Sequence, residues 1–127
     1  MSRGIYITAN DKVTEQAIAL LNSIRLHDPH IPVVMIPYDN QYQAVAELLA
    51  ESYQVTVYQD LEFIDRLSNQ LHQIFGGQFF ARPNQFRKQA CWFGDFDEFI
   101  YIDTDVVVFE KIADNLNYLI DYDFICC

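Results

Sequence analysis

Short apolar runs alternate along the chain with longer segments in which apolar residues recur at helical spacing. Runs of β-prone residues predict strands at 5–8, 33–36, 55–58, 99–102 and 124–127, and the run 106–109 is β-prone as well. Helical spacing predicts helices at about 17–26, 43–51, 61–75, 84–93 and 113–119. Because strands that alternate with helices are joined by right-handed crossovers, this order predicts an α/β fold with a mostly parallel central sheet flanked by helices.

The predicted strand at 33–36 is apolar at every position, which is typical of a strand covered by helices on both faces. In such sheets ligands bind at the carboxyl ends of the strands, so the residues that follow each strand are the first candidates for function. The chain shows no internal repeat and no linker composition. Residues 1–127 are therefore expected to form a single domain.

Composition narrows the classes of function. The 127 residues carry 8 Lys+Arg against 18 Asp+Glu, and a net charge of −10 argues against nucleic acid as a partner. No apolar run reaches the roughly 18 residues of a transmembrane helix, so a cytoplasmic location, at most peripheral to a membrane, is expected. The three cysteines, Cys91, Cys126 and Cys127, are an odd number with one adjacent pair, which favours reduced thiols over disulfides.

Two carboxylates, Asp103 and Asp105, interrupt the nearly apolar stretch 99–109. A carboxylate withdrawn from water is costly unless it is paired or coordinated. Two carboxylates on one side of an extended turn suit a hard divalent cation such as Mg²⁺ or Mn²⁺. The alternative interpretation is a solvated turn, in which aspartates are common.

The block 86–109, which reads FRKQACWFGDFDEFIYIDTDVVVF, resembles the signature of GT-A nucleotide-sugar glycosyltransferases. It is most similar to the glycogenin-like and lipopolysaccharide galactosyltransferase-like group, glycosyltransferase family 8. Lys88 lies at the spacing before Asp103 that this group leads one to expect. The segments 5–11 and 33–39 resemble the first strand with its nucleotide-facing turn and the second strand, which ends in Asp39.

This resemblance implies a GT-A (Rossmann-like) nucleotide-diphospho-sugar transferase fold and transfer of a sugar from a UDP-sugar to an unknown acceptor. It implies that Asp103 and Asp105 hold Mn²⁺ or Mg²⁺, which bridges the diphosphate and offsets the charge of the departing UDP. In an acidic protein this cation and nearby basic residues supply the positive charge that the diphosphate needs. The residues that the resemblance places at the nucleotide or sugar are Thr8, Ala9, Asn10, Asp11, Asp39, Arg87, Lys88, Asp103 and Thr104. Phe79 and Phe80, beside Arg82, are a lesser candidate for a substrate-facing loop.

Members of that group are longer than this chain, and their third metal ligand, a histidine in a late Gly/His segment, has no counterpart before residue 127. The resemblance thus leads us to expect the N-terminal portion of the family's catalytic domain. The histidines present, His27, His30 and His72, are expected to have ordinary surface roles.

Two other interpretations stay open. Haloacid-dehalogenase-like phosphatases also carry an apolar strand followed by Asp-x-Asp, although their motif opens the domain, whereas 102 residues precede Asp103 here. The second is a truncated, non-catalytic module that binds a nucleotide or a partner. A final strand at 124–127 would leave an unpaired sheet edge, and a homo-oligomer is one way of covering it.

Overall fold

Four parallel strands form one sheet in the computed structural model, which describes residues 1–78 and 82–126. The strands are β1 (Arg3–Ala9), β2 (Val33–Pro37), β3 (Thr56–Val57) and β4 (Glu98–Ile102). Their order across the sheet is β3-β2-β1-β4. The chain therefore moves outward from β1 through β2 to β3, and then returns to pair β4 with the opposite side of β1.

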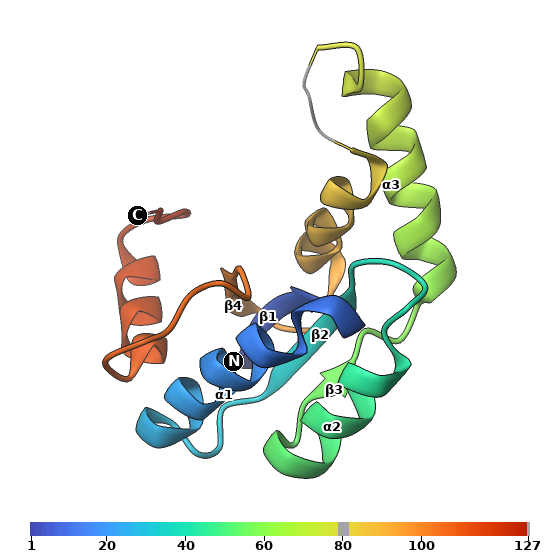
Figure 1. Ribbon diagram of the computed structural model, residues 1–127. Helices are drawn as coiled ribbons and strands as arrows, with labels where there is room; N and C mark the ends of the chain where they lie inside the picture. The colour runs from blue at the N-terminus through green and yellow to red at the C-terminus, as the bar shows by residue number, and fades with distance from the viewer. Residues whose placement is uncertain (79–81, 127) are drawn as a thin grey trace.

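Helices cover both faces of this sheet (Figure 1). The α-helices are α1 (Thr14–His27), α2 (Gln43–Tyr53) and α3 (Leu61–Phe75). Three further segments are 3₁₀ helices, η1 (Asp11–Val13), η2 (Pro83–Phe93) and η3 (Ile112–Ile120). Within the described part of the chain, no helix has the length and apolar character needed to cross a membrane.

The side chains of β1 point alternately to the two faces of the sheet, and each face has its own hydrophobic core. Successive strand residues point to opposite faces, so Ile5 and Ile7 pack toward α1 and α2, whereas Tyr6 packs toward α3 and η2. The first core contains Leu20, Leu21 and Ile24 of α1, Val45 and Leu49 of α2, and Val33 and Met35 of β2. The second contains Ile36, Tyr58, Ile64, Ala90 and Cys91. The α/β class with a parallel sheet flanked by helices is thus confirmed.

The strand predicted at 124–127 is wrong, and the β-prone run 106–109 does not form a strand either. In 106–109, the backbone N–H of Val108 donates to the Ser23 hydroxyl of α1 at 3.0 Å, and the segment joins no sheet. The described part of 124–127 is also not a strand, and Cys126 is exposed there. β-branched and aromatic residues favour strands only where a neighbouring strand offers hydrogen bonds. Cys127 and the pair Phe79 and Phe80 lie outside the described residues.

Three other elements differ in detail from the sequence prediction. The third strand is shorter than predicted and covers only Thr56–Val57. The helices predicted at 84–93 and 113–119 are of the tighter 3₁₀ type. Pro83 begins η2, where the missing proline N–H costs no helical hydrogen bond.

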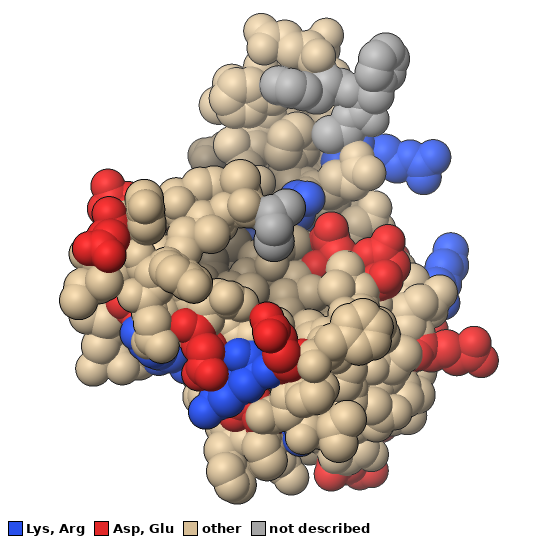
Figure 2. Space-filling model, turned by 90° about the vertical axis from the view of Figure 1, so that its left-hand side faces the viewer, with Lys and Arg blue, Asp and Glu red and all other residues tan. Residues whose placement is uncertain are grey.

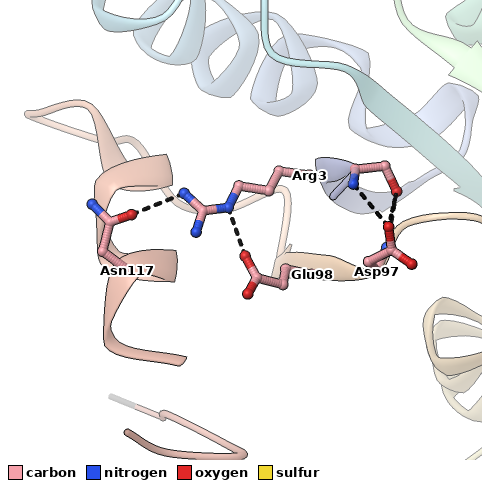
Figure 3. A network of polar contacts seen from close by, with 5 residues as sticks. Arg3, Asp97, Glu98 and Asn117 are labelled. Carbon is pink, nitrogen blue, oxygen red and sulfur yellow. Dashed lines mark hydrogen bonds and ion pairs between the residues drawn. The ribbon is translucent and has the colours of Figure 1, made fainter. Parts of the chain in front are cut away.

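A polar network fixes β4 beside β1 at the amino end of the sheet (Figure 3). The Arg3 guanidinium on β1 forms an ion pair with Glu98 on β4 at 2.6 Å and donates to the Asn117 side chain of η3 at 2.9 Å. The Ser2 backbone N–H donates to the Asp97 carboxylate at 2.8 Å. These contacts hold the edge strand and η3 at the end of the sheet opposite the candidate site.

Close packing beneath η2 depends on glycine. A Cβ atom at Gly94 would overlap the Tyr6 hydroxyl, so only glycine lets this ring lie under the end of η2. Tyr6 also packs against Tyr58 and Phe96, with ring centroids 6.4 Å and 5.2 Å away. The second core therefore contains two buried phenol rings, Tyr6 and Tyr58, among its apolar side chains.

Because of the same core, the free energy of unfolding is expected to depend on pH in the alkaline range. Burial raises the pKa of the Cys91 thiol from 9.0 to about 11 and that of the Tyr58 phenol from 10.0 to about 12. Both groups are neutral in the fold and ionise first in the unfolded chain, so their contribution to stability is complete below pH 9 and is lost as pH rises through 9 to 12. Urea unfolding should therefore show a free energy of unfolding that declines from pH 9 upward, by up to about 1.4 kcal/mol per pH unit for each group.

The variant Cys91→Ala distinguishes the effect of the Cys91 thiol on the pH dependence of unfolding from that of the Tyr58 phenol. It should remove the part of the decline that begins near pH 9 and keep the part that begins near pH 10. Identical pH dependence in the two proteins would show that burial does not shift the thiol.

Candidate functional site

The carboxyl ends of β1 and β4 meet where the strand order reverses. Crevices at such a reversal are the usual ligand sites of open parallel sheets. The register pairs Ile7 with Ile102, which brings Thr8 level with Asp103, the first residue after β4. The fold thus brings the predicted Asp-x-Asp motif beside the predicted nucleotide-facing turn.

The side chain of Tyr101 connects these two segments. Its hydroxyl donates to Asp103 Oδ1 at 2.8 Å and lies 2.8 Å from the Thr8 hydroxyl. Tyr101 was missed by the sequence analysis. The signal was available, because residues two apart on a strand point to the same face, and Tyr101 and Asp103 are two apart.

The electrostatic environment keeps Tyr101 a hydrogen-bond donor. Burial, followed by its bond to the Asp103 carboxylate, raises the Tyr101 pKa above 10.0, whereas the bond with Thr8 opposes this shift. Its phenol is therefore neutral at physiological pH. The Lys88 Nζ atom lies 5.7 Å from the centre of the Tyr101 ring, within reach of a cation–π interaction. This contact holds a positive charge near the carboxylate of Asp103.

Asp103 and Asp105 are both exposed, and Thr104 between them is half-buried. The prediction that these carboxylates are withdrawn from water was therefore wrong, because 106–109 leaves the sheet rather than enclosing them. Their position at the strand reversal, and not the cost of burial, is what favours a ligand site here.

The adjacent carboxyl ends of β1 and β2 form a hydrogen-bonded loop pair. The Asn10 amide donates to Asp39 Oδ2 at 2.9 Å, and Asp39 Oδ1 accepts from the Gln41 backbone N–H at 2.9 Å. Asp11 accepts from the backbone N–H of Val45 near the start of α2, also at 2.9 Å. Asp11 and Asp39 thus stabilise the loops, and the predicted nucleotide contacts of Asn10, Asp11 and Asp39 stay predictions.

Ala9 and Arg87 were also predicted to contact the nucleotide, but both are buried, which limits the contacts that they can make with it. Ala9 is buried in the first core, and its carbonyl accepts from the Tyr38 backbone N–H at 2.9 Å. Arg87 is 5% exposed, and its Nε donates to the Pro37 carbonyl at 2.7 Å. Arg87 also pairs with Asp65 of α3 at 2.8 Å. Lys88, by contrast, is exposed on the side of Tyr101.

The side chains that could ligate a divalent cation supply only part of the ligand set that such a cation requires. The residues that the structure describes include no group of three His, Cys, Asp or Glu side chains placed to hold a metal ion. Mg²⁺ commonly keeps several waters and takes one or two carboxylates together with phosphate oxygens of the substrate. Asp103 and Asp105 are both exposed, and two carboxylates of this kind fit that mode of binding.

Comparisons with known proteins come from a family model and from solved structures. Residues 2–119 match the family model described as "Mannosyltransferase putative". No curated protein matches the sequence. The fold is similar to that of TarS from S. aureus, with a TM-score of 0.56 and 15% sequence identity. A structure of TarS residues 1–349 gives the same TM-score and identity.

These structural matches cover 97% of this chain but only 20% of the TarS chain and 33% of its 1–349 form. The chain therefore spans a third or less of the proteins it resembles. At 15% identity the likeness establishes the fold alone, and it agrees with a Rossmann-like arrangement of the parallel sheet.

Proposed function

Because this chain belongs to that mannosyltransferase family, we propose that it binds the nucleoside-diphosphate sugar donor of a glycosyl transfer at the carboxyl ends of β1 and β4. One observation carries the proposal. The Asp-x-Asp motif follows β4 directly, and the Tyr101 hydroxyl joins its first aspartate to Thr8 across the strand reversal. Family membership favours this function over the phosphatase alternative.

Each side chain of the site has a role in this proposal. Asp103 and Asp105 would hold Mg²⁺ or Mn²⁺, a cation that neutralises the diphosphate and favours its departure. The neutral Tyr101 phenol orients the Asp103 carboxylate, as the hydrogen-bond partners of metal ligands commonly do. Lys88 brings a positive charge to the phosphates. The β1 turn, from Thr8 to Asp11, would line the nucleoside.

The donor has two parts to identify, the nucleoside and the sugar. The resemblance of 86–109 to GT-A enzymes of glycosyltransferase family 8 favours uridine as the base, so we propose a UDP-sugar. The family description names mannose as the transferred sugar. We expect the sugar acceptor to bind outside the carboxyl ends of β1 and β4, where the donor is placed.

Ligand-observed NMR with a panel of donors tests this proposal. Saturation transfer from the protein to UDP-glucose, UDP-galactose, UDP-GlcNAc and GDP-mannose is measured with Mg²⁺ and again after chelation. We expect transfer to the uracil and ribose protons of the UDP-sugars in the presence of Mg²⁺, and at least about tenfold weaker binding in Lys88→Gln, which loses a charge-assisted phosphate contact. Lys111→Gln removes the same charge from an exposed position on the η3 side and should leave the signals unchanged.

The pattern of signals separates the parts of the proposal. Transfer to GDP-mannose alone would retain the donor site and replace uridine by guanosine. Absence of transfer to every donor would contradict the donor site itself.

A further inference from the structure

Helices α3 and η2 pack along each other and project from the sheet as an arm (Figure 1). We call these two helices, Leu61–Phe75 and Pro83–Phe93, the α3–η2 arm. Only a few of its residues reach the second core, among them Ile64, Ala90 and Cys91. Much of the surface of the arm therefore faces away from the sheet.

Large apolar side chains are exposed on this arm. Ile74 is 63% exposed, Phe93 62% and Trp92 55%. Between the two helices lies an open groove of about 490 Å³, lined by Gln89 and by the apolar residues Leu67, Leu71, Phe75, Phe86, Trp92 and Phe93. A mostly apolar groove together with exposed large apolar side chains is typical of a surface that binds another molecule.

The segment 66–94, which forms most of the arm, has a charge opposite to that of the rest of the protein. Residues 66–94 contain four of the eight basic residues and none of the eighteen acidic residues. Arg66 and Arg82, which directly precedes η2, are exposed, and within the described ranges neither forms an ion pair. Lys88 is exposed as well but faces Tyr101 at the candidate site. Figure 2 agrees, because basic but no acidic side chains are visible toward the tip of the arm.

We propose that the α3–η2 arm binds the surface of an anionic phospholipid bilayer. Exposed basic residues beside tryptophan, phenylalanine and isoleucine match both parts of such a surface, the anionic headgroups and the upper part of the acyl region. A hydrophilic polyanion would satisfy the cations but would leave Ile74, Trp92 and Phe93 in water. The remainder of the protein carries sixteen of the eighteen acidic residues, so it is repelled from the same surface and faces away from it. The other two, Glu62 and Asp65, lie at the start of α3, where Asp65 pairs with Arg87.

The chain contains a built-in probe for this contact. Trp92 is the only tryptophan, it is more than half exposed, and it borders the groove. Adding vesicles of phosphatidylglycerol and phosphatidylcholine in equal parts should shift its emission to shorter wavelength and sediment the protein. Pure phosphatidylcholine vesicles should do neither, and 0.5 M salt should reverse both effects because it screens the headgroup charge.

Two variants of the arm test the two parts of the surface. Arg66→Gln combined with Arg82→Gln should weaken binding to the anionic vesicles about 25-fold, since each basic residue near such a surface contributes roughly a fivefold factor. Ile74→Gln combined with Phe93→Gln should weaken binding at least about tenfold. Phe109→Gln combined with Ile120→Gln changes side chains that are 86% and 88% exposed outside the arm, and should bind like the parent protein.

Three results would overturn the inference. These are no binding to anionic vesicles, equal binding to neutral vesicles, or a Trp92 shift that soluble polyphosphate produces as fully as vesicles do. The inference does not rest on the nucleotide site. A protein that binds UDP but no vesicles would contradict the bilayer contact alone, and a protein that binds vesicles but no UDP would contradict the donor site alone.

Discussion

The substitution Asp105→Asn is expected to weaken Mn²⁺-dependent UDP binding by about 100-fold or more. Loss of an outer-shell partner of a metal ligand already costs about 10- to 100-fold in metal affinity, and loss of a ligand should cost at least as much. Asp105 is exposed and no described residue bonds to its carboxylate, so the fold should be retained. The free energy of unfolding should change by no more than about 0.5 kcal/mol. Calorimetric titration and urea unfolding of the same preparation measure both quantities.

Asp121→Asn is the matched control. It removes the same charge from another exposed aspartate, near the end of η3, and should leave UDP binding unchanged. Unchanged UDP binding in Asp105→Asn would show that the Asp-x-Asp segment is a solvated turn. Equal losses in both variants would indicate an effect of overall charge.

The second large effect is expected from Arg87→Ala, which should lower the free energy of unfolding by about 3 kcal/mol. The buried guanidinium donates to the carbonyl of Pro37 at the end of β2 and pairs with Asp65 of α3. Its removal leaves that carbonyl without its charged donor and opens space between η2 and the sheet. The ion pair contributes less than the carbonyl contact, because the Asp65 side chain is 58% exposed. Urea unfolding at pH 7 measures the change.

The adjacent residue provides the comparison. Lys88→Ala removes the same charge from the same helix at an exposed position, and its free energy of unfolding should change by no more than about 0.5 kcal/mol. Together with the weaker donor binding expected of Lys88→Gln, the two variants would assign stability to Arg87 and phosphate binding to Lys88. An Arg87→Ala protein as stable as the parent but defective in UDP binding would reverse that assignment.

The fold could largely be predicted because its strands are short apolar runs between amphipathic helices. The strands at 33–36 and 99–102 and the helix at 61–75 appear within a few residues of their predicted ends. The runs at 106–109 and 124–127 have equally favourable composition, yet neither joins the sheet. Composition cannot tell whether a neighbouring strand will be present, and that is what decides the outcome.

The candidate site was predicted in part. Asp103 and Asp105 were found because carboxylates in an apolar stretch are unusual, although their expected burial was wrong. Tyr101 was missed because an aromatic residue in an apolar strand reads as core, and its partner Thr8 is 93 residues away. Arg87 and Lys88 look alike in the sequence, and only the packing of η2 separates the buried residue from the exposed one.

Calorimetric titration of the protein with UDP, in Mn²⁺ and in EDTA, tests the donor site most directly. The proposed site predicts saturable binding of one UDP per chain in Mn²⁺, absent in EDTA and absent in the variant that combines Asp103→Asn with Asp105→Asn. Binding of equal strength in EDTA, or in that variant, would contradict a nucleotide site built on these two aspartates.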